Sequence, residues 1–161
     1  MKPSALHPAR PASAEDQAAS ADLWLRRAAI ALSVIGLIVA SYLVYAKYNP
    51  ASALCTGAGD CAAVNASRWS EIYGIPVAAF GAAAYLFLLV VLLLENRHAL
   101  LQSWGPLAVF GAALSGTLYS AYLTYIELAV IHQVCPYCVT SAVVMTLIFL
   151  ISIPRLRRYL N

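Results

Sequence analysis

The stretch that decides the fold is IYGIPVAAFGAAAYLFLLVVLLL, residues 72–94, which contains no Asp, Glu, Lys or Arg. Residues 28–46, 99–126 and 133–154 are equally free of charge. Each stretch matches the roughly 20 residues that a helix needs to cross a bilayer. Of the 161 residues, 62% are hydrophobic and 11% are charged, whereas soluble domains carry about 25% charged residues. The sequence therefore predicts an integral membrane protein with four spans.

The spans are predicted to be helices rather than strands. A membrane span satisfies its backbone hydrogen bonds either within a helix or within a closed barrel. Continuous apolar runs without strict alternation exclude the barrel. We therefore predict an all-α integral membrane protein, a four-transmembrane-helix bundle, with spans near residues 28–46, 72–94, 106–126 and 134–153. The third span carries a stripe of small residues that lets a neighbouring helix approach closely; it consists of Ala108, Ala112, Gly116 and Ser120.

The basic residues predict the orientation in the membrane. Eight of the ten lie at the two ends of the chain or in the middle loop, and only Lys47 and Arg68 lie in the other two loops. By the positive-inside rule, both termini are cytoplasmic. Residues 1–22 are rich in Ala, Pro and Ser, so we expect a disordered cytoplasmic tail there, followed by a membrane domain over residues 23–161.

Four cysteines fall at the predicted outer ends of the spans. Cys55 and Cys61 lie in a loop with two glycines between them, and Cys135 and Cys138 open the last span. In a bacterium this is the oxidising side of the membrane, where disulfides persist. Thiols in such positions can pass electrons between a protein outside the bilayer and a carrier dissolved in it.

The pair Cys135 and Cys138 has the features of a reactive dithiol. Pro136 suits the first position of a helix, so Cys135 is expected at the helix cap and Cys138 in the first turn. The positive end of a helix favours the thiolate form of cysteine. Cys138 would lie about 4 to 5 Å deeper than Cys135. We expect Cys138 to face the apolar carrier and Cys135 to face the loop.

The loop pair is expected to work as a relay. The glycines between Cys55 and Cys61 let this loop close into a disulfide and move, and exchange with Cys135 would proceed through a mixed disulfide. Two other interpretations compete. A structural zinc site is disfavoured because the first cysteine spacing is wider than the usual two to four residues, and two inert structural disulfides remain an alternative.

The order of these features resembles the vitamin K epoxide reductase family. The motifs that carry the resemblance are Cys55 and Cys61; Ser67, Arg68 and Trp69; Gly74, Ile75 and Pro76; Phe80 and Gly81; and Cys135, Pro136, Tyr137 and Cys138. The resemblance covers about residues 28–153. A second class of quinone-linked thiol oxidases, which resembles the bacterial disulfide-bond protein B, places the narrow cysteine pair before the wide one. The order in this chain fits the reductase family better.

The resemblance implies a four-helix bundle around a quinone site, with Cys135 and Cys138 at its mouth. It implies that Cys138 reacts with the quinone and that Cys55 and Cys61 pass electrons to Cys135. It also implies a short capping helix over the quinone within residues 62–74.

Candidate quinone contacts come from the motifs and from the third span. Ser67 matches a serine that the family keeps near the site, and Phe80 belongs to the Phe-Gly motif. Tyr119, Tyr122 and Tyr125 recur every three residues and either line the quinone pocket or act as ordinary interfacial tyrosines.

Two acid–base groups follow the third span in the sequence. Glu127 and His132 are expected in a solvated loop. Proton transfer during quinone reduction is the alternative role for both.

Two departures from the family pattern narrow the expected function. Animal members carry an asparagine three residues before the Phe-Gly pair and a tyrosine four residues after the second cysteine, where this chain has Val77 and Ala142. Since these polar contacts to a vitamin K ring are missing, oxidation of thiols by a membrane quinone is favoured over epoxide reduction. Many bacterial relatives are fused to a thioredoxin-like domain, whereas this sequence ends seven residues after Pro154.

The sequence thus predicts a thiol–quinone oxidoreductase in the cytoplasmic membrane of a bacterium. Its expected partners are the lipid bilayer and a separate thioredoxin-like protein on the outer face. Binding to nucleic acid is not expected. Its expected cofactor is ubiquinone or menaquinone, without a metal. A vitamin K quinone or epoxide reductase is the first alternative, and a non-enzymatic tetraspan protein with structural disulfides is the second.

Overall fold

The computed structural model describes residues 12–49 and 61–160. Within these ranges, four helices are long and apolar enough to cross a membrane, which confirms the predicted fold class. The four are α1 (Ala12–Tyr48), α3 (Val77–Leu94), α4 (Ala99–Ile126) and α5 (Pro136–Leu160). Their apolar sequences account for the helices, because backbone groups in a bilayer have to be satisfied within the span.

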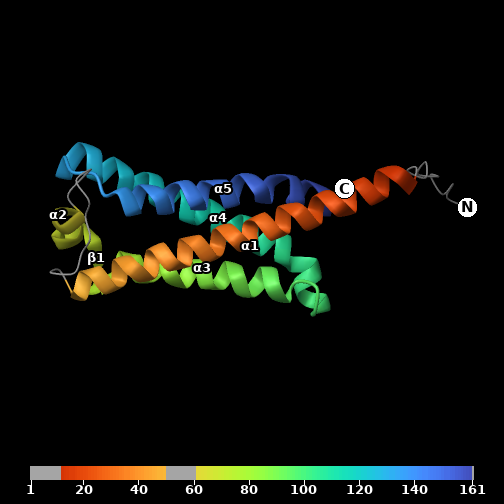
Figure 1. The fold of residues 1–161 in the computed structure, drawn as a ribbon, viewed down its shortest axis with the longest axis horizontal. Helices are drawn as coiled ribbons and strands as arrows, with labels where there is room; N and C mark the ends of the chain where they lie inside the picture. The colour runs from red at the N-terminus through yellow and green to blue at the C-terminus, as the bar shows by residue number, and fades with distance from the viewer. Residues whose placement is uncertain (1–11, 50–60, 161) are drawn as a thin grey trace, which may run out of the picture.

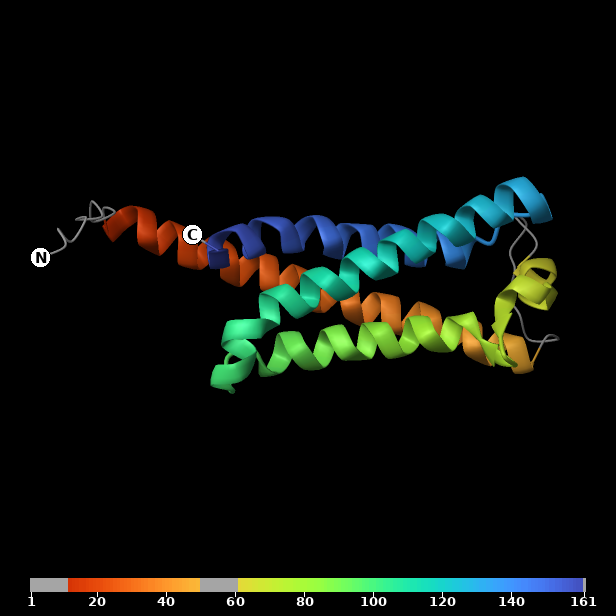
Figure 2. The same cartoon turned by 180° about the vertical axis from the view of Figure 1, so that it is seen from behind.

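The helices pack as an up-and-down bundle. Figures 1 and 2 show α1 and α3 side by side, with α5 packed against both α1 and α4. The end of α5 and the connection between α3 and α4 lie at one end of the bundle. The start of α5 lies at the opposite end, together with the short elements that follow α1 (Figure 1). The described cysteine positions therefore lie at the end of the bundle opposite to the end of α5 and the connection between α3 and α4.

Close helix contacts at small residues hold the bundle together. A Cβ atom added to Gly36 in α1 would lie 2.2 Å from Cε1 of Tyr85 in α3, so only glycine fits beneath this ring. The Tyr85 hydroxyl donates a hydrogen bond to the carbonyl of Ser141 in α5, at 2.8 Å. In the predicted stripe of the third span, a Cβ atom on Gly116 would lie 2.9 Å from Sδ of Met145. This contact confirms that the stripe allows close approach of α4 and α5.

A buried charge network joins three helices near the end that holds the termini. Nη2 of Arg155 in α5 donates hydrogen bonds to both carboxylate oxygens of Glu95, at 2.8 and 2.9 Å. Nε of the same guanidinium contacts Asp22 of α1, at 3.1 Å. Arg155 is only 5% exposed. A buried charge is tolerated only when it is paired, so the network fixes how these helices sit relative to one another.

A short cap covers the opposite end of the bundle. It consists of α2 (Cys61–Ala66), a 3-10 helix η2 (Arg68–Ser70) and a two-stranded hairpin, β1 (Glu71–Ile72) with β2 (Ile75–Pro76). The hairpin turns at Tyr73 and Gly74, which have φ angles of 51° and 80°, as a tight two-residue turn requires. A capping helix is therefore present, but it ends at Ala66, and the rest of the range implied for it forms η2 and the start of the hairpin.

Lys47 ties the cap to the end of α1. Its Nζ donates hydrogen bonds to the carbonyl of Asn65 and to Oγ of Ser70, the latter at 2.8 Å. The same amine forms an ion pair with Glu71 at 2.9 Å. One basic side chain thus holds α2, η2 and β1 against the helix that precedes them.

Three helix boundaries differ from the prediction. α1 begins at Ala12, so part of the expected disordered tail is helical; the segment is rich in alanine, which favours helix, and Asp22 within it pairs with Arg155. Residues 72–76 form the hairpin instead of the start of a span. α4 starts at Ala99 rather than near residue 106 and contains Pro106, which removes one backbone hydrogen bond but is tolerated in membrane helices.

Candidate active site

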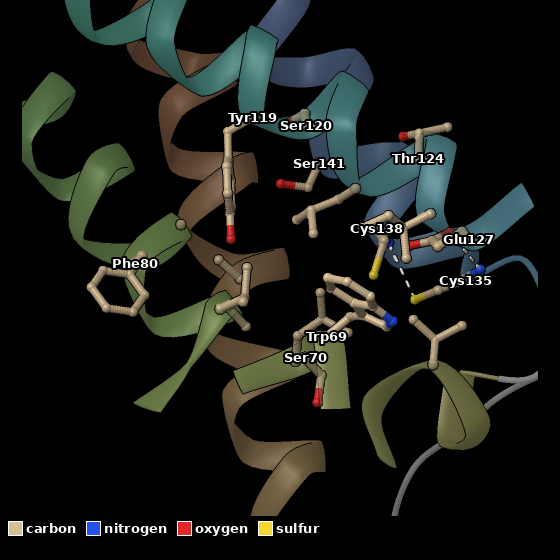
Figure 3. A pocket seen from close by; sticks show the side chains of 18 of the residues that line it. Trp69, Ser70, Phe80, Tyr119, Ser120, Thr124, Glu127, Cys135, Cys138 and Ser141 are labelled. Carbon is tan, nitrogen blue, oxygen red and sulfur yellow. Dashed lines mark hydrogen bonds between the residues drawn. The ribbon is translucent and has the colours of Figure 1, made fainter. Parts of the chain in front are cut away.

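A cavity of about 200 Å³ lies between the four long helices, directly under the cap. All four helices and the cap contribute to its wall, and most of the lining is apolar. Figure 3 shows the two sulfur atoms of Cys135 and Cys138 at one end of this cavity, with the Trp69 indole beside them. The sequence-distant motifs therefore meet around one space.

Cys135 occupies the cap position of α5. The helix begins at Pro136, so Cys135 immediately precedes it, as predicted. Its sulfur accepts a hydrogen bond from the backbone N–H of Cys138, at 3.3 Å. A sulfur held by an N–H at the positive end of a helix is stabilised as a thiolate.

Cys135 is also the more enclosed of the two cysteines. It is 1% exposed and packs against Leu43 of α1 and Val64 of α2. This agrees with the expectation that Cys135 faces the loop segment. Cys138 is only partly buried, and both Cys138 and Cys135 line the cavity. The sequence alone predicts that only Cys138 faces this space.

Glu127 is buried beside the two cysteines, and the expectation of a solvated loop is wrong for it. The residue is 5% exposed, and its Oε2 accepts the backbone N–H of Cys135 at 3.1 Å. Its side chain lies beside that of Cys138 on the cavity wall (Figure 3). His132, in contrast, is exposed as expected.

Glu127 faces inward because it extends the cavity-facing side of α4, about one turn after Leu123. A π-helical turn, η3 (Glu127–Ile131), begins at this residue. It directly continues α4, and the carbonyl of Glu127 accepts the backbone N–H groups of His132 and Gln133. His132 has a φ of 56°, which ends the turn. Such turns are rare and occur frequently at functional sites. An acidic residue at the end of an otherwise apolar span was the sequence signal for this site, because ionisable groups at membrane depth are costly and usually functional.

The four predicted quinone contacts divide into three that line the cavity and one that does not. Ser67, Phe80 and Tyr119 border the cavity, whereas Tyr122 does not and is 50% exposed. The helical repeat explains the difference. On α4, Tyr119 faces the cavity together with Gly116, Ser120 and Leu123. Tyr122 is rotated about the helix axis by about 60° from Tyr119, in the direction away from these three residues. The prediction for Tyr122 is therefore corrected.

Sequence reasoning missed several other polar or aromatic side chains in the wall, among them Trp69 and Ser141. Trp69 lies next to both sulfurs (Figure 3), and Ser141 lies one turn beyond Cys138 on α5. Trp69 stands in the sequence motif with Ser67, so the motif pointed to it. Ser141 follows Cys138 by three residues, and that spacing places both on one helix face.

The loop pair is described only in part. Cys61 is the first residue of α2, and its side chain lies outside the described part of the structure, as does the whole of Cys55. The predicted relay between this pair and Cys135 thus stays a prediction.

The residues around the cavity fit the head group of a quinone. Small-molecule sites are mainly apolar and contain a few placed polar groups, and here Ser67, Tyr119 and Ser141 supply hydroxyls in a wall that is otherwise largely apolar. The volume of about 200 Å³ is below the roughly 300–1,000 Å³ of pockets for whole drug-sized ligands. It suits one ring system rather than a complete long-chain lipid.

Comparison with known protein families agrees with this geometry. The model of the vitamin K epoxide reductase family matches residues 27–153, a range that contains α3, α4, the cap and the cysteine pair, together with most of α1 and α5. The chain belongs to the vitamin K epoxide reductase family. It is a multi-pass membrane protein and a redox enzyme of that type.

Proposed function

We propose that this member of the family is a thiol–quinone oxidoreductase that reoxidises a separate thioredoxin-like protein and reduces a membrane quinone. The observation that carries the proposal is the position of the Cys135 and Cys138 sulfurs, which border an apolar cavity between membrane helices. A dithiol in this position is accessible to a lipid-soluble carrier on one side and to the cap on the other.

The chemistry requires two electrons and two protons to leave the dithiol. Cys138 would give up its proton first, and the sulfur of Cys135 would then form the S–S bond with it while the two electrons pass to a bound quinone. A bound quinone supplies the oxidising power and leaves as the quinol. Cys135 is suited to the second role because its sulfur is held toward Cys138 by the 3.3 Å hydrogen bond from the Cys138 N–H.

Electrons would reach this pair through Cys55 and Cys61. The supporting observation is the path of α2, which begins at Cys61 and contains Val64, a residue that packs against Cys135. A short movement of this cap would bring a loop thiolate to the Cys135–Cys138 disulfide. The thioredoxin-like partner would in turn reduce the loop disulfide from the outer face.

The quinone ring would lie between the cap and α4. Ser67, Phe80 and Tyr119 line the cavity from three different elements, and Trp69 offers a flat face next to the sulfurs. Aromatic side chains favour offset stacking with other planar rings. Val77 also lines the cavity, so an apolar wall stands where animal members carry an amide. This favours a simple quinone, ubiquinone or menaquinone, over an epoxide.

The proposed location is the cytoplasmic membrane of a bacterium, with both termini in the cytoplasm. The basic residues at the ends of the chain and in the middle loop support this orientation. The cap and the cysteine pairs would then face the oxidising compartment, where new disulfides are needed.

Purified protein in lipid nanodiscs tests the proposal directly. A reduced thioredoxin-like protein is mixed with the enzyme and a short-chain ubiquinone or menaquinone, and quinol is measured by absorbance. We expect turnover that requires both the partner protein and the quinone. Turnover of a vitamin K epoxide with small thiols alone would favour the epoxide reductase. Absence of turnover with every quinone would leave only a structural role for the disulfides.

A further inference from the structure

The buried carboxyl group of Glu127 has no role in the chemistry described so far. It lines the same cavity as the two sulfurs, and it is held by the backbone N–H of Cys135 at 3.1 Å. The side chain of Cys138 lies next to it on the same wall (Figure 3). The carboxyl group is therefore bonded to one residue of the reactive pair and lies beside the other.

A purely structural explanation for this carboxyl group is weak. Among the described residues, Glu127 forms no ion pair with a Lys, Arg or His side chain, in contrast to Glu95, which is paired with Arg155. Burying an ionisable group without an opposite charge is costly. A neutral glutamine would accept the Cys135 N–H equally well. The carboxyl group offers one property that glutamine lacks, which is the ability to accept and release a proton.

We propose that Glu127 is a catalytic proton carrier, which accepts the proton of the Cys138 thiol and releases it into the cavity. This proposal rests on the proposed function, because that function requires Cys138 to lose a proton beside a quinone, which takes up protons when it is reduced. Two adjacent negative charges are unfavourable in an apolar site. Glu127 and Cys138 would therefore hold one proton between them, and the proton moves to Glu127 when the sulfur reacts.

The proton and electron balance is complete with this residue. The Cys138 S–H bond breaks and its proton moves to the Glu127 carboxylate. The sulfur of Cys135, which has already released its proton to the solvent as a thiolate, then forms the S–S bond with Cys138, and two electrons leave the pair. A bound quinone would take up these two electrons with two protons, one from Glu127 and one from the solvent. Glu127 returns to the carboxylate form and is ready for the next cycle.

The substitution Glu127→Gln tests the proposal with two measurements. The first is the infrared S–H stretching band of Cys138 in reduced protein without any quinone, assigned by its loss in Cys138→Ser. We expect the band to shift in Glu127→Gln, because the thiol loses a charged hydrogen-bond acceptor. The second is the single-turnover oxidation of the reduced enzyme by a short-chain ubiquinone. We expect a loss of about 100-fold or more, the usual effect of removing a general acid–base group.

Two further variants separate proton transfer from a loss of fold. His132→Asn serves as the matched control, because it changes an exposed titratable residue at the same turn to one that tolerates a positive φ; it should oxidise at the wild-type rate. Glu127→Asp keeps the carboxyl group and should recover part of the rate. Reduction of the Cys135–Cys138 disulfide by dithiothreitol should proceed equally in Glu127→Gln and wild type.

Each contrary result has a distinct meaning. Wild-type quinone oxidation rates in Glu127→Gln would overturn the proton-carrier role. An unshifted S–H band would overturn direct transfer between Cys138 and Glu127, even with a slow rate. A wild-type enzyme that never reacts with quinone, while the S–H band shifts as expected, would instead overturn the proposed function.

Discussion

Glu127 and Cys135 are joined by a 3.1 Å hydrogen bond from the backbone N–H of Cys135 to Oε2 of Glu127. The bond ties the end of α4 to the residue that caps α5. Pro136, the first residue of the helix, has no N–H. The N–H of Cys135 is therefore the last backbone donor before the helix begins. The acid, the capping sulfur and the helix start thus form one unit at the cavity.

Cys138→Ala should abolish quinone reduction. Its sulfur lines the cavity, and without it the pair cannot form a disulfide. Stopped-flow measurement of quinol formation provides the check, with circular dichroism to confirm a folded bundle. Quinone turnover at more than background in this variant would contradict the assignment of Cys138.

The same variant should accumulate a mixed disulfide between Cys135 and either Cys55 or Cys61. Once Cys138 is absent, no second thiol resolves that bond. Non-reducing peptide mapping by mass spectrometry detects the linked peptides, and the double variant Cys135→Ser, Cys138→Ala is the control. If Cys55 is found paired only with Cys61 while wild type turns over, the relay is ruled out.

Tyr119→Ala should raise the KM for quinone, whereas Tyr122→Ala should leave it unchanged. Tyr119 lines the cavity and Tyr122 lies outside it. Loss of one aromatic contact costs about 0.5–1.5 kcal/mol, which corresponds to a KM increase of up to about tenfold. Steady-state kinetics with varied quinone provide the measurement. Equal KM values for the two variants would contradict the position of the ring.

A membrane-impermeant thiol reagent should label Cys55 or Cys61 in intact cells after mild reduction. A cysteine introduced by Ser103→Cys should stay protected, because Ser103 lies in the first turns of α4, at the end of the bundle near the chain termini. Mass shifts on gels reveal the labelling, and permeabilised cells supply the positive control. Labelling at position 103 with no labelling at the loop pair would mean the opposite orientation.

Gly36→Ala should destabilise the bundle, whereas Gly111→Ala should not. The added methyl group at residue 36 would lie 2.2 Å from the Tyr85 ring, but no atom lies within 4 Å of the one at residue 111. Overpacking a core costs about 1–3 kcal/mol. Thermal unfolding in detergent compares the two variants with wild type. Identical midpoints for all three proteins would show that Tyr85 moves aside freely.

The sequence by itself was enough for the fold class, the four spans and the position of the cysteine pair at the start of the last helix. These features are local in origin. A bilayer selects apolar segments by length, and a proline at the first helical position marks where the helix begins. The resemblance to a family also came from residues that lie in recognisable order along the chain.

The tertiary structure alone decided which side chains share the cavity. Glu127 is buried because it lies on the cavity side of α4 and accepts the N–H of Cys135, whereas a sequence shows only an acid after a span. Tyr122 is excluded because rotation around α4 separates it from Tyr119 by a fraction of a turn. Residues 72–76 belong to a hairpin, and Lys47 holds the start of this hairpin through its contacts with Ser70 and Glu71. Each outcome depends on contacts between segments that are distant in sequence, and local hydrophobicity does not encode these contacts.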